Sequence, residues 1–190
     1  MGDGFIRWYR ESGRTSIFRY QVEHFGRFGV TVKNPGTGVV AAVNVDGDDV
    51  PVTCDELEWL LSLRLSPVTM NWWMSSDSNL AAEYSYESLG CEIQTFWLDG
   101  LSREEVDTVT RAVENTASLS PTSTRALVFD FEEATEPDDW DSLALYGEKA
   151  IPALVDSLLL GSDLANSLIL NSTGISGEEM ESGLVRISGI

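Results

Sequence analysis

The stretch that decides the fold is Val39–Val52, which reads VVAAVNVDGDDVPV. β-Branched residues are frequent at both ends, and Asp46-Gly47 in the middle is a favoured two-residue hairpin turn. The stretch therefore predicts two antiparallel strands. Thr53–Glu56 follows directly and has the pattern of a capping box, in which the threonine caps the first helical turn and the glutamate reaches back. We expect a helix after it that ends before Pro67.

The same signals recur along the chain. Alternating or apolar runs predict further strands at residues 5–10, 16–22, 28–32, 68–74, 81–86, 91–97, 127–131, 167–170 and 184–187. A second capping box at Ser102–Glu105, an acidic stretch at Thr135–Asp141 and the apolar run Ile151–Leu160 predict helices. Successive strands joined by hairpin turns argue against a parallel βαβ sheet. The predicted fold class is α+β: a mostly antiparallel sheet of hairpins and a meander, with two to four helices packed on it.

The length is that of one domain. The chain has 190 residues, 43% of them hydrophobic, which is enough to bury a substantial core. We expect a single domain over residues 1–190. The Ser/Thr/Pro-rich stretch 116–124 is a possible internal boundary.

Charge is the strongest compositional signal. The chain holds 12 Lys and Arg against 31 Asp and Glu, a formal net charge of −19. Six of the basic residues and only three acidic ones lie in residues 1–33, where Arg7, Arg10 and Arg19 are mixed with aromatics. That mixture occurs where strands meet nucleic acid, but the acidic remainder would repel a polyanion, so we expect no nucleic-acid binding. No apolar run approaches the length of a membrane-spanning helix, so we expect no membrane insertion.

Few side chains suit catalysis by proton transfer. His24 is the single histidine, and it is expected near a strand end. Cys54 and Cys91 have no metal-ligand spacing, and phosphate-binding glycine motifs are absent from the sequence. We therefore expect no metal and no cofactor. Without a signal-peptide pattern, the cysteines are expected to be free thiols in a reducing cytoplasm, a single disulfide being the alternative.

A calcium loop is a second interpretation of the predicted hairpin. With Asn44 in the first position, Asp46 and Asp48 fall at ligand positions. The motif then requires glycine where the chain has Asp49. The hairpin interpretation is therefore favoured.

An acidic run and three tryptophans form the candidate site. The densest acidic run comprises Asp130, Glu132, Glu133, Glu136, Asp138, Asp139 and Asp141. Trp72 and Trp73 are adjacent on a predicted strand, so their side chains point to opposite faces. One of them is then either covered by a helix or exposed as an interface anchor. Trp140 lies within the acidic run. We expect these seven acids, with Trp72 or Trp73 and Trp140, to bind a partner.

Three functions are compatible with these residues. The first is a non-catalytic acidic module that occludes a basic partner protein, as inhibitors and immunity proteins occlude nucleases or toxins. The second is a carboxylate- or metal-dependent hydrolase, because Asp130 and Glu132 would share one face if the strand continued through both. The third is a structural or regulatory module whose acidity only keeps it soluble.

Overall fold

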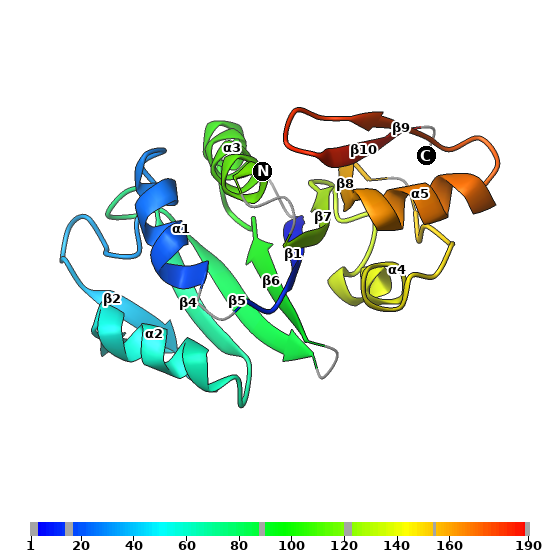
Figure 1. Ribbon diagram of the computed structural model, residues 1–190. Helices are drawn as coiled ribbons and strands as arrows, with labels where there is room; N and C mark the ends of the chain where they lie inside the picture. Colours follow the sequence, from blue (N-terminus) through cyan, green and yellow to red (C-terminus); the bar gives the residue numbers. More distant parts are fainter. Residues whose placement is uncertain (1–3, 14–16, 88–89, 120–122, 154, 189–190) are drawn as a thin grey trace.

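A computed structural model describes residues 4–13, 17–87, 90–119, 123–153 and 155–188 (Figure 1). These residues form one antiparallel sheet of ten strands, in the order β3-β2-β4-β5-β6-β1-β7-β8-β10-β9. The strands are β1 (Phe5–Glu11), β2 (Val40–Val43), β3 (Asp49–Val52), β4 (Val68–Trp73), β5 (Asn79–Glu87), β6 (Cys91–Trp97), β7 (Thr124–Asp130), β8 (Ser157–Gly161), β9 (Ser176–Glu179) and β10 (Leu184–Ser188).

Five α-helices and one 3-10 helix pack on the sheet. They are α1 (Ile17–Gly26), α2 (Cys54–Leu63), α3 (Arg103–Ser118), η1 (Pro137–Trp140), α4 (Asp141–Tyr146) and α5 (Ser162–Asn171). The predicted α+β class and antiparallel sheet are confirmed, and the helix count is slightly above the two to four expected. No helix among the described residues is long and apolar enough to cross a membrane.

The helices divide between the two faces of the sheet. Helices α1, α2 and α3 share one hydrophobic core with Trp8, Trp72 and Phe96. On the opposite face, Tyr9, Ile93 and Val128 pack with η1, α4 and α5. Side chains alternate between faces along a strand, so β1 contributes Trp8 to the first core and Tyr9 to the second. Figure 1 shows α4 and α5 beside the β7–β10 end, away from α1 and α2.

Strand β1 lies near the middle of the sheet. It pairs with β6 on one side and β7 on the other, and Phe5 is opposite both Trp97 and Asp130. The strands before and after residues 116–124 therefore belong to one sheet. Residues 116–118 continue α3, and residues 120–122 lie outside the described part of the chain.

The hairpin turn and the two capping boxes form as the sequence predicts. Strands β2 and β3 form the expected hairpin, and Gly47 at its turn has a φ of +87°. Thr53 and Ser102 both cap their helices, with the glutamate three residues later completing each capping box. These motifs depend on a few neighbouring residues, which is why the sequence alone identifies them.

Four predicted elements were wrong. The strand expected at 16–22 is part of α1, and His24 lies in that helix; residue 16 is outside the described residues. The strand expected at 28–32 is reduced to a single bridge between Thr31 and Trp73. The helix expected over Ile151–Leu160 is replaced at its end by β8, and the strand expected at 167–170 belongs to α5. Strand β9 had no counterpart in the prediction.

Short apolar runs explain these errors. Leu158, Leu159 and Leu160 are all buried because β8 is covered on both faces, so its sequence does not alternate. In α1 the buried positions are Phe18, Gln21, His24 and Phe25, and the polar ones among them hide the helical period. Periodicity alone does not separate a helix from a strand in such segments.

Candidate functional site

Asp130 ends β7 and is fully buried. Its Oδ1 accepts a hydrogen bond from the Ala134 backbone N–H at 2.9 Å. Its Oδ2 accepts from the Thr135 N–H at 2.8 Å and the Thr135 hydroxyl at 2.7 Å. The carboxylate therefore closes the loop that follows the strand. Facing inward, Asp130 has no surface to offer a partner.

The other acids of the run lie outside this loop closure. We call residues 132–141 the acidic segment. It exposes the five carboxylates of Glu132, Glu133, Glu136, Asp138 and Asp139, whereas Asp141 is half-buried. Glu133 has a φ of +55°, a left-handed conformation that turns the chain between the strand and η1. The segment is thus a short loop, a 3-10 turn and the start of α4, with charge on its outer side.

Trp140 attaches the acidic segment to the hydrophobic core. Its ring is fully buried in the core under α4, and its Nε1–H donates to the Thr135 hydroxyl at 2.9 Å. The same hydroxyl donates to Asp130, so the three side chains form one chain of hydrogen bonds. Trp140 therefore holds the acidic segment in place but cannot contact a partner in the folded protein.

Arg7 attaches the acidic segment to strand β1. Its Nη2 contacts Asp141 Oδ1 at 2.8 Å and Asp138 Oδ1 at 2.9 Å. Its Nε donates to the Tyr9 hydroxyl, and its Nη1 donates to the Thr95 hydroxyl. Burial alone would lower the pKa of Arg7, but the neighbouring Tyr9 and Asp141 outweigh it and the pKa is raised. A permanently charged guanidinium thus joins β1 to the acidic segment.

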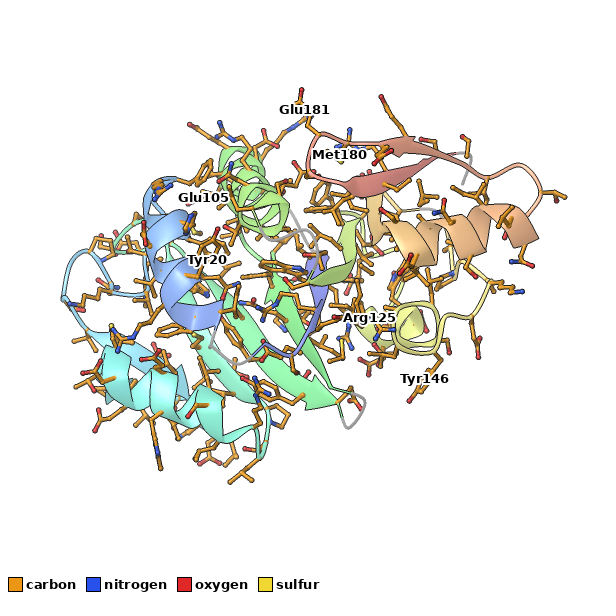
Figure 2. All side chains as sticks on the ribbon, in the orientation of Figure 1. Tyr20, Glu105, Arg125, Tyr146, Met180 and Glu181 are labelled. Carbon is orange, nitrogen blue, oxygen red and sulfur yellow. The ribbon has the colours of Figure 1, made fainter. Side chains whose placement is uncertain are left out.

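The far end of α4 is also tied to the sheet. Arg125 on β7 donates from Nη2 to the backbone oxygen of Leu145 at 3.2 Å. Figure 2 shows Arg125 and Tyr146 close to α4. This contact holds the end of α4, while Arg7 and Trp140 hold the acidic segment itself to the sheet and the core.

The two tryptophans predicted to face opposite sides do so. Trp72 packs against Phe18 and Phe25 in the core and is fully buried. Trp73 lies on the other face and is half-buried. Of this pair, only Trp73 retains surface for a partner.

Trp97 is an exposed ring that the sequence analysis did not select. Its side chain is 36% exposed and meets Phe5 edge-on, with ring centroids 6.4 Å apart. Phe5 is opposite Trp97 on one side and Asp130 on the other, so two strand spacings, roughly 10 Å, separate Trp97 from Asp130, two residues before the acidic segment. The pair Phe96-Trp97, one ring buried and one exposed, carries the same signal that singled out Trp72-Trp73.

Part of the sheet has no helical cover on the side of Trp73 and Trp97. Within the described residues, η1, α4 and α5 cover only the part of this side from β6 to β10 in the sheet order, because their core partners come from β6, β1, β7, β8 and β10. Register places Glu83 of β5 next to Thr95, and Thr95 next to Arg7, on this side. The uncovered part of the sheet therefore adjoins the acidic segment.

The four described arginines near the N-terminal end are engaged within the protein. Arg7 and Arg10 are buried, and Arg10 pairs with Glu92 at 3.2 Å. Arg19 and Arg27 are exposed but also form ion pairs with acids. Their pairing removes the basic stripe that the sequence pattern of arginines and aromatics suggested.

Asp130 and Glu132, the carboxylates considered for a hydrolase, do not lie together: Asp130 is buried and Glu132 is exposed. Strand β7 ends at Asp130, so the alternation that would bring Glu132 to the same face stops before it. No cluster of three or more His, Cys, Asp and Glu suited to a metal ion occurs among the described residues. His24 stacks on Tyr20 in α1, and both cysteines are free. Burial raises the pKa of the Cys91 thiol.

Comparison of the chain with protein-family models, with curated proteins and with solved structures gives no match.

Proposed function

We propose that this chain is a non-catalytic binding module that occludes a basic partner protein, such as a nuclease or toxin, in the manner of an inhibitor or immunity protein. The observation that carries the proposal is the fixed acidic segment. Five exposed carboxylates lie within eight residues, on backbone held by Asp130, Trp140 and Arg7.

Fixed carboxylates favour association with a basic surface. Because the scaffold already orders the segment, little conformational entropy is lost when it binds. Only Asp138 among the five exposed carboxylates is paired with a cation within the described residues. The other charges are available to steer a basic partner and to pair with its Arg and Lys side chains.

Trp97 supplies an apolar anchor beside these charges. Tryptophan is enriched among residues that dominate interface energies, and it is most effective when surrounded by contacts that exclude water. Trp73 adds a second, half-buried ring on the same side of the sheet. We therefore place the interface on Trp97, Trp73 and the acidic segment, replacing the buried Trp72 and Trp140 as anchors.

The test compares two triple variants with the same change in net charge. One is Glu132→Gln/Glu133→Gln/Glu136→Gln in the acidic segment. The matched control, Glu178→Gln/Glu179→Gln/Glu181→Gln, neutralises three exposed acids at β9 and its turn. Partners captured at low salt are identified, purified and titrated by calorimetry against each protein.

We expect a basic partner, bound roughly 10-fold more weakly by the first variant because exposed ion pairs contribute about 0.2–1 kcal/mol each. The control variant should bind like the unmodified protein. Only acidic partners, or equal loss in both variants, would contradict the proposal.

A further inference from the structure

A polar pocket of about 430 Å³ lies on the opposite side of the sheet from the acidic segment. The start of α1, the end of α2 and strands β5 and β6 enclose it, and its lining includes Leu61, Arg64, Tyr84, Tyr86 and Glu92. Its size is within the range of small-molecule sites. The proposed function does not use this pocket.

Two guanidinium groups share one carboxylate at its inner wall. Glu92 is buried, and its Oε2 lies 3.2 Å from Arg10 Nη2 while its Oε1 accepts from Arg64 Nη2 at 2.8 Å. The three groups together carry a net charge of one positive unit, inside a chain whose net charge is −19. Arg10 and Glu92 are buried and neutralise each other, whereas Arg64 is exposed, so the remaining unit of positive charge lies at the mouth of the pocket.

Arg10 has an incomplete set of partners. It is 3% exposed, its guanidinium stacks over Trp8, and its buried Nε–H has no hydrogen-bond acceptor among the described residues. Burial lowers its pKa even though Glu92 acts in the opposite direction.

Arg64 is held over the pocket in a conformation that arginine rarely adopts. It caps the end of α2 with φ +53° and ψ +33°, a left-handed geometry in which glycine is usual. Its guanidinium lies over the Tyr86 ring, and only its Nη2 is used, for Glu92 and the Gly13 carbonyl. The Nε–H and the second amino group make no hydrogen bond to the described residues. Strained residues with unused donors are typical of binding sites.

The Tyr86 and Tyr84 hydroxyls complete the polar wall. Tyr86 donates to the Leu61 carbonyl at 2.7 Å, and Tyr84 donates to the Gln21 side chain at 2.9 Å. Burial raises the pKa of Tyr86 to about 12, so this hydroxyl is neutral at physiological pH. Neutral hydroxyls and free guanidinium N–H groups do not repel an incoming oxyanion.

We propose that this pocket binds a small organic anion through its carboxylate or phosphate group. The oxyanion contacts the unused donors of Arg64, the exposed arginine of the Arg10–Glu92–Arg64 cluster. Ile17 and Leu61 in the lining contact the apolar part of the ligand. Guanidinium groups bind carboxylates and phosphates through paired, charge-assisted hydrogen bonds.

The test is calorimetric titration with sodium phosphate and, separately, sodium acetate, at constant ionic strength against a sodium chloride reference. The proteins are the unmodified chain, Arg64→Gln, and the matched control Arg111→Gln, which removes the same charge from an exposed site on α3. The control should bind like the unmodified chain. Arg64→Gln should bind roughly 10- to 100-fold more weakly, as the loss of a charge-assisted hydrogen bond implies.

Each outcome decides the proposal. Binding of only one anion assigns the ligand's phosphate or carboxylate group. No heat beyond the chloride reference from either anion overturns the pocket assignment, as does equal affinity in the Arg64 and Arg111 variants. If circular dichroism shows that Arg64→Gln does not fold, Arg64→Lys replaces it: weaker binding supports the paired geometry, and unchanged binding overturns it. None of these results depends on a protein partner.

Discussion

Single side chains determine which acids reach the surface. Asp130 and Glu132 are two residues apart, yet one carboxylate is saturated by loop N–H and O–H donors and the other faces solvent. The acidic run was predictable from composition. The inward turn of Asp130 was not, because it depends on where β7 ends and on the position of Thr135. The burial of Trp72 and Trp140 depends in the same way on distant helices.

Replacing the Asp130 carboxylate tests its role in loop closure. Asp130→Asn keeps the side-chain size. It replaces one carboxylate oxygen, which accepts hydrogen bonds from the loop, by an amide group that can only donate. Because a buried donor is then left unsatisfied, we expect a loss of about 2–3 kcal/mol in the free energy of unfolding, measured with urea. Glu132→Gln is the control and should change it by less than about 0.5 kcal/mol. Equal effects of the two substitutions would show that Asp130 does not close the loop.

The two thiols should differ in reactivity. Cys54 is partly exposed at the start of α2, whereas Cys91 is fully buried in β6. Since attack requires an accessible thiolate, a thiol reagent should modify one cysteine in the native protein and both in urea. Mass spectrometry of Cys54→Ser should then show no modification under native conditions. Rapid labelling of Cys91 in that variant would contradict its burial.

Elements differ in how far their sequences specify them. The capping boxes at Thr53 and Ser102 and the Asp46-Gly47 turn are complete within a few residues, so they were predicted correctly. Helix α1 and strand β8 were not, because tertiary packing decides between helix and strand in short apolar runs. Within the candidate site, the adjacent aromatics Phe96 and Trp97 could have indicated Trp97 from the sequence, but its place near Asp130 depends on the register of β6, β1 and β7.

The capping boxes make a prediction for acid stability. Hydrogen bonds from Thr53 lower the pKa of Glu56, and hydrogen bonds from Ser78 and Ser102 lower the pKa of Glu105. A carboxylate with a lowered pKa stabilises the fold above its unfolded pKa, about 4.3, and loses that contribution as pH falls through the folded value. Glu56→Gln/Glu105→Gln should therefore show a smaller loss of stability between pH 5 and pH 3 (roughly the range in which carboxylates titrate) than the unmodified chain.

Urea unfolding at each pH measures this difference. Glu104→Gln, in the first turn of α3 and outside the capping pair, serves as the control. Its loss of stability between roughly pH 5 and pH 3 should equal that of the unmodified chain. Parallel curves for all three proteins would show that the caps do not titrate with folding.

The close contact between the start of β1 and the end of β7 gives a second prediction. A Cβ added to Gly4 would lie 1.9 Å from the backbone oxygen of Asp130, so Gly4→Ala forces the β1–β7 pair apart. We expect a loss of about 1–3 kcal/mol, typical of overpacking. Gly26→Ala in α1 meets no neighbour and should be neutral or stabilising by up to about 1 kcal/mol. Thermal unfolding measures both, and a neutral Gly4→Ala would contradict the close approach.

At the scale of the whole molecule, charge repulsion acts against the compact state. The net charge is −19, and six of the arginines are engaged in ion pairs within the described residues. Raising sodium chloride from roughly 10 mM to 150 mM shortens the Debye length from about 30 Å to 8 Å, which should raise the unfolding midpoint. Differential scanning calorimetry checks the direction.

The matched control reduces the charge itself. Glu178→Gln/Glu179→Gln/Glu181→Gln carries three fewer negative charges, so its midpoint should rise less over the same salt range. A midpoint that falls with salt would mean that ion-pair attraction outweighs surface repulsion.

The central place of β1 has a consequence for the order of folding. Both neighbours of this strand, β6 and β7, lie some eighty or more residues later in the chain. During synthesis, β1 must wait for residues near 130 before its ladder closes on both sides. Such distant pairings slow folding, so the nascent chain carries Ile6 and Trp8 uncovered through much of its own translation.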